Sequence, residues 1–338
     1  MTTSSRRLVF GIYPGGVAGD DSGLLVGPPD EPDQINRCLR DLQGISRPFV
    51  VRCYDSFQDS DSPLGNTGPA PANYAQYAVS GVRPLELVLQ FRSTSGDVAG
   101  YLDFVRGKLK QHHQNLYAVQ ITEEPNFLDG PNVIDGPYPN VRLALTEGVT
   151  AAKQTLRELG QPHVKVGFNA TPTFGPSSEF WTDLKSLAKT AFVESLDYVG
   201  LDFFPDVFRP AASDGQPGDL VSSVIAVLET LRYVWLPSAG IPDRIPIHIT
   251  EHGWPTSPTR SVAHQAQVLE TVIRTIHDLS PKLNIERYML FALRDVDHSN
   301  ATNEENIFRF FGITTSDYTQ KKPAFDKFRA LVHELGMQ

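Results

Sequence analysis

The chain has 338 residues, of which 40% are hydrophobic and 20% are charged, and this balance excludes an intrinsically disordered protein. No run approaches the ~20 apolar residues of a membrane-spanning helix, and two cysteines are too few for a disulfide-stapled fold. The net charge of −9 argues against binding to nucleic acid, because an acidic surface repels phosphate groups. We therefore expect neither a nucleic-acid partner nor a membrane partner.

Apolar runs that predict strands alternate with amphipathic patterns that predict helices along the whole chain. Taken in chain order, the predicted strands are Leu8–Tyr13, Phe49–Tyr54, Leu85–Phe91, Asn115–Thr122, Val164–Asn169, Tyr198–Phe204, Ile245–Thr250 and Ile285–Leu293. The helices predicted to follow them, in the same order, are Pro32–Gly44, Ala70–Ser80, Asp97–His112, Asn140–Leu159, Ser178–Leu196, Leu220–Leu236, Ser261–Leu279 and Lys322–Leu335.

This alternation predicts the architecture. Strands that alternate with helices are parallel and joined by right-handed crossovers, and eight such units make a (β/α)8 or TIM barrel. A doubly wound sheet would carry a glycine-rich phosphate turn after its first strand, but G-x-G-x-x-G is absent there. No linker rich in Pro, Gly and Ser divides the chain. We therefore predict an α/β fold with a single barrel domain over residues 1–338.

The first apolar run is too short for an export signal. It extends from Leu8 to Tyr13 and stops at Pro14, whereas the apolar core of such a signal needs about 7–15 residues. We therefore interpret this run as the first strand and expect a cytoplasmic protein, unless an export signal has been removed from the chain.

The active site of such a barrel lies at the carboxyl ends of its strands, so the residues that close each strand are candidates. Two carboxylates stand out: Glu124, which precedes Pro125, and Glu251, which precedes His-Gly-Trp-Pro255. Cleavage of a glycosidic bond needs two carboxyl groups, one protonated and one ionised. Two facing strand ends can hold such a pair about 5–5.5 Å apart, which is the separation found in retaining enzymes.

These residues resemble the signature of clan A, the retaining β-glycoside hydrolases built on (β/α)8 barrels. The resemblance implies that Glu124 is the general acid/base and that Glu251 is the nucleophile. It also implies that Arg52, which closes the second strand, hydrogen-bonds the nucleophile. The tail from Phe311 to Ala324, which ends in Lys-Lys-Pro-Ala, is similar to the final stretch of that clan, so the resemblance covers nearly the whole chain.

Two positions depart from the clan pattern. The clan normally has an Asn before the acid/base Glu, which hydrogen-bonds the sugar 2-hydroxyl, and this chain has Glu123 there. A carboxylate at this position would raise the pKa of Glu124 and favour its protonated form. Many members also place a Tyr on strand six against the nucleophile. Here Phe203 stands in that region, and Tyr13 or Tyr54 are the candidates to replace the missing Tyr.

The alternation of side chains along each strand tests these assignments. On the fourth predicted strand it places Gln120 and Glu124 toward the barrel interior, and Glu123 away from the pocket. On the seventh, Glu251 shares the phase of the isoleucines that precede it. Either those isoleucines fill the barrel interior, or the end of this strand is bulged.

We therefore expect a glycosidase that acts on a β-linked carbohydrate by double displacement, without a cofactor or a metal ion. Transfer to another sugar would use the same residues. Arg52 would keep Glu251 ionised by charge pairing. The Trp254 ring suits either stacking on a sugar or plain packing in the rim. The expected substrate-binding residues are Arg52, Tyr13, Glu123, Asn169, Asp202, Trp254 and Asp295.

Two other functions fit the same residues. Glu123 and the missing strand-six Tyr are also compatible with a carbohydrate-binding barrel that has no catalytic activity. A metal-dependent barrel isomerase or aldolase could use Glu123, Glu124 and Glu251 as ligands.

Overall fold

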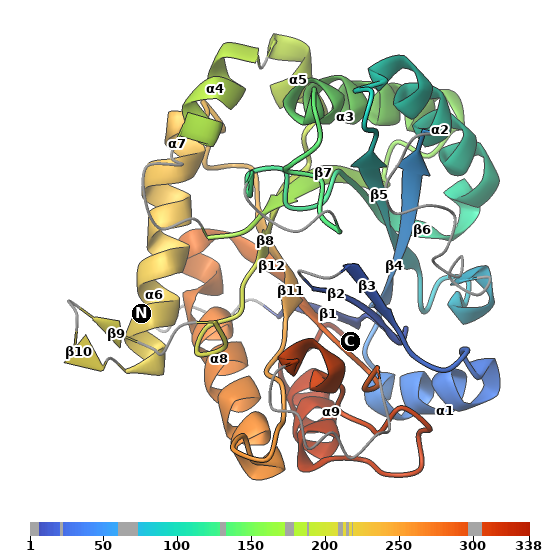
Figure 1. The fold of residues 1–338 in the computed structure, drawn as a ribbon. Coiled ribbons are helices and arrows are strands. Elements are labelled where there is room, and N and C mark those ends of the chain that lie inside the picture. Colours follow the sequence, from blue (N-terminus) through green and yellow to red (C-terminus); the bar gives the residue numbers. More distant parts are fainter. Residues whose placement is uncertain are drawn as a thin grey trace.

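The structure is a computed structural model that describes residues 7–20, 23–59, 74–128, 133–172, 179–187, 189–208, 212–213, 216–217, 219–296 and 306–338. Its parallel strands close into a barrel in the order β1-β12-β11-β8-β7-β6-β5-β4 (Figure 1). These strands are β1 (Val9–Ile12), β4 (Phe49–Gln58), β5 (Leu85–Arg92), β6 (Leu116–Ile121), β7 (Lys165–Ala170), β8 (Tyr198–Asp202), β11 (Ile247–His252) and β12 (Ile285–Leu290). The predicted (β/α)8 barrel is therefore confirmed.

Helices surround the barrel as an outer ring (Figure 1). They are α1 (Pro32–Gln43), α2 (Val98–His112), α3 (Val141–Glu158), α4 (Glu179–Leu187), α5 (Thr190–Ser195), α6 (Leu220–Thr230), α7 (Leu236–Ser238), α8 (Val262–Leu283) and α9 (Pro323–Leu335). Side-chain caps mark several starts: Asp97 accepts from the N–H of Gly100 before α2, and Ser261 accepts from the N–H of His264 before α8.

The apolar core fills the layer between the barrel and the ring of helices. Phe168 on β7 shows the packing, with ring centroids 6.3 Å from Trp181 of α4 and 6.1 Å from Phe192 of α5. Trp181 also stacks on Trp235 at 6.1 Å. Both tryptophans thus belong to the packing of the outer ring. The strands read as apolar runs because side chains on one face enter this layer and those on the other fill the barrel.

Two predicted helices differ from the structure. In the described part of Ala70–Ser80 there is only a 3-10 turn, Tyr74–Tyr77, because Val79 then forms a β-bridge with Arg83. The helix predicted over Ser178–Leu196 consists of α4 and α5. Lys189 has extended backbone and starts α5 as a separate helix.

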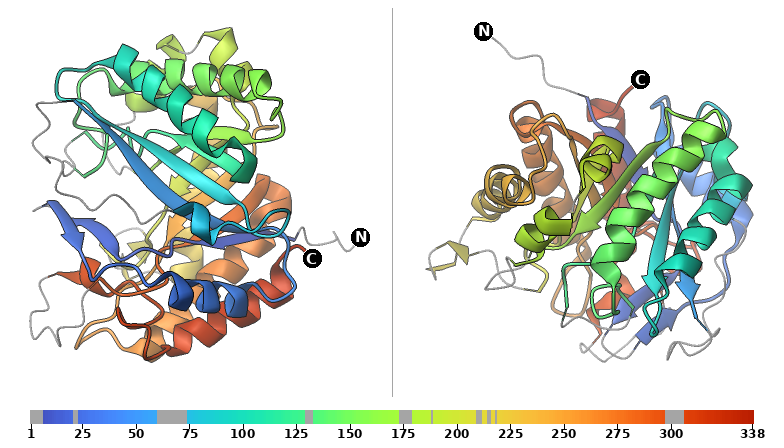
Figure 2. Two further views of the ribbon diagram at one scale, coloured as in Figure 1. Left: turned by 90° about the vertical axis from the view of Figure 1, so that its right-hand side faces the viewer. Right: turned by 90° about the horizontal axis from the view of Figure 1, so that it is seen from above.

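A short hairpin on the rim was not predicted. It pairs β2 (Val17–Asp20) with β3 (Gly23–Val26) directly after β1, and the N–H of Gly27 donates to the oxygen of Gly16 at its base. It lies at one end of the barrel, and the described ends of the chain lie at the other (Figure 2). A second small hairpin pairs β9 (Ala212–Ser213) with β10 (Gln216–Pro217). The remaining short helical segments are His113–Asn115, Ile307–Phe310 and the π-helical Leu231–Trp235.

One stretch, Leu220–Ser238, is long and apolar enough to cross a membrane by its length and its mean hydropathy of 1.3. The prediction that no stretch approaches this limit is therefore wrong by that measure. In the fold this stretch belongs to the outer ring and packs on α8. It carries the buried Arg232, whose guanidinium donates to the backbone oxygens of Leu283 at 3.0 Å and Ile245 at 3.1 Å.

Gly253 offers a test of how closely the ends of β11 and β12 approach. A Cβ at this position would lie 1.8 Å from the backbone oxygen of Phe291, so Gly253→Ala must push the two strand ends apart. We expect this substitution to lower the free energy of unfolding by about 1–3 kcal/mol or more. Gly107→Ala on the exposed side of α2 is the control: a Cβ there meets nothing within 4 Å, and gains helix propensity of about 0.5–1 kcal/mol. Thermal or urea unfolding measures both, and equal stabilities would contradict the close approach.

Candidate active site

The predicted site residues meet at the rim where the barrel strands end, because the carboxyl ends of parallel strands lie on the same face. One carboxylate oxygen from each of Glu123, Asp202 and Glu251 lies within 4.8 Å of the other two. Arg52 lies 3.3 Å from Glu123 and 3.5 Å from Glu251. We call Arg52, Glu123, Glu124, Asp202 and Glu251 the carboxylate cluster.

The backbone after β6 departs from strand geometry and turns Glu123 into this cluster. Thr122 has φ of 64° and Glu124 has φ of 44°, in a region that residues other than glycine rarely adopt. Alternation predicts Glu123 outside the pocket, and this prediction is wrong because the turn at Thr122 breaks the alternation. Asp135 stabilises the turn, since its Oδ2 accepts from the N–H of Glu123 at 2.8 Å and from that of Phe91 at 2.7 Å.

A β-bulge near the end of β11 brings Glu251 into the cluster. Ile247 and Ile249 pack in the apolar layer beneath the helices, and the pairing of β11 with β8 shifts register between Ile249 and Glu251. The bulge changes the side on which later residues emerge, so Glu251 faces inward although it shares the sequence phase of the isoleucines. Of the two alternatives left open by the alternation, the bulged strand is the one observed.

Asn169 connects Glu124 to Asp202. Its Oδ1 accepts from the backbone N–H of Glu124 at 2.9 Å, and its Nδ2 donates to Asp202. Thr250 Oγ1 also donates to Asp202, at 2.6 Å. Asn169 is fully buried and both ends of its amide are engaged within the protein. It therefore positions its two neighbours, and its role in binding the substrate stays a prediction.

The guanidinium of Arg52 uses all its nitrogens within the site. Nη1 donates to Glu86 and to Gln120, each at 2.9 Å, and Nη2 faces two carboxylates of the cluster. Nε donates to the Tyr54 hydroxyl at 2.6 Å. The contact of Arg52 with Glu251 is the one that the resemblance to clan A implies. The charge of Arg52 is divided among several acceptors.

Burial and mutual repulsion raise the pKa values of the clustered carboxyl groups. Desolvation raises the pKa of Glu124 well above its usual range, and the charges of Glu123 and Glu251 raise it further. Desolvation and the charge of Glu123 raise the pKa of Glu251 to about 8, although the charge of Arg52 lowers it. Desolvation and the charge of Glu251 likewise raise the pKa of Asp202. Arg52 thus acts on Glu251 in the predicted direction, since its charge lowers this pKa, but burial and the charge of Glu123 raise the same pKa by more.

One tyrosine contacts Glu251, and a second packs against the first. The Tyr54 hydroxyl donates to Glu251 Oε1, so Tyr54 is the one of the two candidate tyrosines that contacts this carboxylate. Tyr13 packs edge-on against Tyr54, with ring centroids 5.1 Å apart, and stacks on Phe291 at 5.3 Å. Tyr13 therefore supports the Tyr54 ring at the inner edge of the rim.

Two other residues predicted to bind substrate have their partners within the protein. Trp254 is 3% exposed, its indole Nε1 donates to the backbone oxygen of Asp206 at 3.2 Å, and Arg260 covers its ring. Trp254 thus packs within the rim, as the second alternative for this residue predicts. Asp295 accepts from Lys322 Nζ at 2.8 Å and from a backbone N–H of the tail at 3.0 Å. It ties the segment after β12 to the tail.

The spacing of Glu123, Asp202 and Glu251 is one that a metal ion could use. Arg52 Nη2, however, already brings a positive charge within 3.5 Å of two of these carboxylates. A divalent ion at the same place would be repelled by the guanidinium. This geometry disfavours the metal-dependent isomerase or aldolase.

The chain matches no protein-family model and no curated protein, but it matches solved structures. A family 39 glycoside hydrolase from Bacteroides cellulosilyticus has a TM-score of 0.60 at 14% identity, over 97% of this chain and 64% of that chain. A family 2 β-galacturonidase from Eisenbergiella tayi has a TM-score of 0.61 at 13% identity, over 99% and 52%. A family 1 β-glucosidase from Thermotoga maritima has a TM-score of 0.60 at 12% identity, over 98% of both chains.

The chain shares a barrel fold with these solved structures. At identities of 12–14% this similarity concerns the fold, and it agrees with the fold that the resemblance to clan A implies. The chain spans between half and two thirds of the length of the family 39 and family 2 structures, and nearly all of the family 1 structure.

The sequence analysis missed two charged residues below the cluster. Glu86 on β5 and Arg287 on β12 are fully buried and pair with each other. Glu86 is the second residue of β5 and Arg287 is the third residue of β12, and both strands contain other polar residues. Their pairing makes their burial possible, because an unpaired buried charge is too costly. The strand sequences alone do not single out this pair, since Glu286 is a second charged residue of β12 and is only partly buried.

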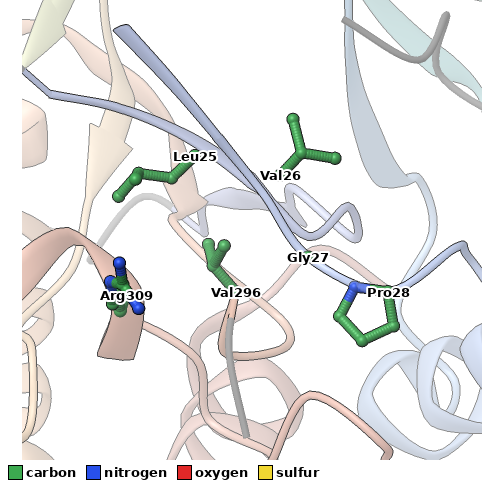
Figure 3. A pocket seen from close by; sticks show the side chains of 6 residues that line it. All are labelled: Leu25, Val26, Gly27, Pro28, Val296 and Arg309. Atoms are coloured by element: carbon green, nitrogen blue, oxygen red, sulfur yellow. The ribbon is translucent and has the colours of Figure 1, made fainter. Parts of the chain in front are cut away.

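A separate cavity of about 290 Å³ lies on the rim, between the β2–β3 hairpin and the segment after β12 (Figure 3). It is lined by Leu25, Val26, Gly27, Pro28, Val296 and Arg309. The predicted site residues all lie outside this lining. Among the residues that the structure describes, the lining of this cavity contains no carboxyl group, whereas the carboxylate cluster contains several, so the cluster is the candidate active site.

The raised pKa of Glu251 predicts how stability depends on pH. Folding raises this pKa from 4.5 to about 8, so the native state favours the protonated form, and the stability it contributes is present below pH 4.5 and lost as the pH rises to about 8. Glu251→Gln cannot ionise, so above pH 8 we expect the variant to be more stable than wild type by about 0.5–2 kcal/mol. Denaturant unfolding at a series of pH values measures this difference.

The advantage of Glu251→Gln should shrink as the pH falls toward 4.5. Glu194→Gln, on the exposed side of α5, is the matched control and should show no such trend. A Glu251→Gln variant that is less stable than wild type at high pH would contradict the account of the cluster given above.

Proposed function

We propose that this protein is a retaining glycosidase that cleaves a β-linked glycoside by double displacement. One observation carries the proposal: Glu124 and Glu251 lie half-buried on the same rim, close enough for the charge of Glu251 to raise the pKa of Glu124. In such a pair one carboxyl group, here Glu124, keeps its proton, and the other, Glu251, can lose its proton. Cleavage of a glycosidic bond requires this division.

In the first step Glu251 is ionised and one of its oxygens attacks the anomeric carbon. The bond from that carbon to the leaving oxygen breaks, and Glu124 transfers its proton to this oxygen. The products are a glycosyl ester on Glu251 and the free alcohol.

In the second step a water molecule takes the place of the alcohol. Glu124, now ionised, accepts a proton from the water while its oxygen attacks the anomeric carbon. The ester bond to Glu251 breaks, the sugar leaves with retained configuration, and Glu124 is protonated again. An acceptor sugar in place of water would give transfer by the same route.

Neighbouring residues support these roles. Arg52 and the Tyr54 hydroxyl contact Glu251 Oε1, so they stabilise the ionised nucleophile and the carboxylate that leaves in the second step. Asn169 holds the backbone of Glu124. The fold is shared with proteins named β-glucosidase and β-galacturonidase, which supports a β-linked carbohydrate as substrate.

Substitution of the two carboxylates tests the assignment. Glu251→Gln should abolish covalent labelling by a panel of 2-fluoro glycosides, because the nucleophile is lost. Glu124→Gln should lower kcat about 10²–10⁴-fold on substrates with poor leaving groups, and less on activated aryl glycosides that need no proton. Mass spectrometry of the labelled protein and turnover of aryl β-glycosides measure these effects.

The control is Glu194→Gln, which should turn over like wild type. Undiminished hydrolysis by Glu251→Gln would refute the assignment. Binding of glycosides without turnover of any of them would favour the carbohydrate-binding barrel instead.

The pH dependence of turnover is a further prediction. The nucleophile must be ionised, and the pKa of Glu251 is about 8, so kcat/KM should rise as the pH increases toward and through that value. It should fall again at higher pH where Glu124 loses its proton, since the pKa of Glu124 is also raised. A pH series with an aryl β-glycoside measures the profile. An optimum in the ordinary range of a free carboxyl group would contradict this expectation.

A further inference from the structure

A second buried ion group lies directly beneath the carboxylate cluster, and the proposed mechanism does not use it. Glu86 on β5 is its centre and is fully buried. Its Oε1 accepts from Arg287 and from the Tyr198 hydroxyl, the latter at 3.1 Å. Its Oε2 accepts from Arg52 Nη1 at 2.9 Å. Glu86 therefore connects Arg287 below it to Arg52 above it.

We propose that Glu86 is a positioning residue for the reaction, which holds Arg52 beneath Glu251 and Glu123 and takes up part of its positive charge. The proposal rests on the proposed function, because it concerns the nucleophile assigned there. Glu86 has no contact with the reacting atoms and acts through Arg52.

The geometry of the guanidinium is the first argument. Its two terminal nitrogens are fixed in one rigid plane and point in different directions: Nη1 donates to Glu86 and Gln120, and Nη2 faces Glu123 and Glu251. An arginine held at Nη1 must present Nη2 to the carboxylates above. Removal of the bond to Glu86 frees this orientation.

Arg287 is itself held in place, so it provides a fixed base for Glu86. Its guanidinium lies over the rings of Tyr198 and Tyr117, at 5.3 Å and 5.7 Å from their centroids. The Tyr198 ring is in turn stacked on the ring of His248, with ring centroids 4.2 Å apart. Among the described residues, Glu86, Arg287, Tyr198 and His248 are thus fully buried and packed against one another.

The distribution of charge is the second argument. Burial alone would raise the pKa of Glu86, but the charges of Arg287 and Arg52 outweigh it and lower this pKa to about 2. Glu86 is therefore ionised at every pH at which the protein would work. The negative charge of Glu86, which lies against Arg52 Nη1, partly compensates the guanidinium charge. It therefore weakens the attraction of Arg52 for Glu123 and Glu251.

Several groups face Glu251 and together set its affinity for a proton. They are Arg52 and Tyr54 from β4, Glu123 and Glu124 after β6, and Asp202 from β8. Among these Arg52 is the cation, so a change in its charge or placement alters Glu251 directly. Neutralising Glu86 leaves the charge of Arg52 less compensated and should favour ionised Glu251.

The test compares pH profiles of kcat/KM for wild type and Glu86→Gln. We expect the acid limb of the variant to move to lower pH by about one unit, because Glu251 loses its proton more readily. Tyr198→Phe is the matched control: it removes a buried hydrogen bond to Glu86 without changing a charge, and its acid limb should stay in place. An acid limb of Glu86→Gln that coincides with wild type would overturn the proposal.

A second variant covers the case in which Glu86→Gln does not fold. The double variant Glu86→Gln/Arg287→Met removes the lower ion pair as a unit and leaves no buried charge without its partner. The double variant removes the negative charge of Glu86 and the positive charge of Arg287, and Glu86 is the nearer of the two to Glu251. The acid limb should therefore move in the same direction as in Glu86→Gln, but by a smaller amount. An unchanged or upward-shifted limb would count against the proposal.

A direct titration separates this inference from the proposed function. The carboxyl carbon of Glu251, labelled with ¹³C and assigned by its loss in Glu251→Gln, reports its ionisation by NMR without any turnover. A lower titration midpoint in Glu86→Gln supports the inference that Glu86 takes up part of the charge of Arg52, and an unchanged midpoint refutes it. Absence of turnover in wild type on every glycoside tested would refute the glycosidase alone and leave this result standing.

Discussion

Arg52 lies among buried carboxylates, 3.3 Å from Glu123 and 3.5 Å from Glu251, and it also pairs with Glu86 at 2.9 Å. If all acids of the cluster were ionised, their charge would far exceed that of this one guanidinium. Burying such an excess costs more than its attraction to one arginine offsets. The cluster therefore favours protonated carboxyl groups, and the pKa values of Glu124, Asp202 and Glu251 are all raised above their usual range. The proposed chemistry depends on that retention.

Local departures from regular strand geometry bring the acids together. Thr122 and Glu124 have positive φ after β6, and β11 is bulged before Glu251. Each departure is stabilised by buried partners, such as Asp135 beneath the backbone of Glu123. Strained backbone at a functional site persists where surrounding contacts determine it, and here those contacts are made by residues that stay out of the proposed reaction.

The sequence was sufficient for the fold because the strand and helix patterns are long and alternate without a break. It was also sufficient to place Glu124 and Glu251 at strand ends, since the end of an apolar run marks the rim. It was not sufficient for Glu123, because a period of two extrapolates a regular strand and cannot detect the turn at Thr122. Trp254 differs for another reason: its burial depends on Asp206 and Arg260 from other segments, which no local pattern reveals.

The described ends of the chain are joined at the amino-terminal face of the barrel. The N–H of Leu8 donates to the oxygen of Leu335 at 3.1 Å, and the N–H of Met337 donates to the oxygen of Leu8 at 3.0 Å. This face lies opposite the rim that carries the carboxylates and the β2–β3 hairpin (Figure 2). A partner protein fused to either end, or a solid support attached there, would therefore stand behind the barrel. The side from which a substrate approaches would remain unobstructed, which makes this barrel suited to tethering by either end.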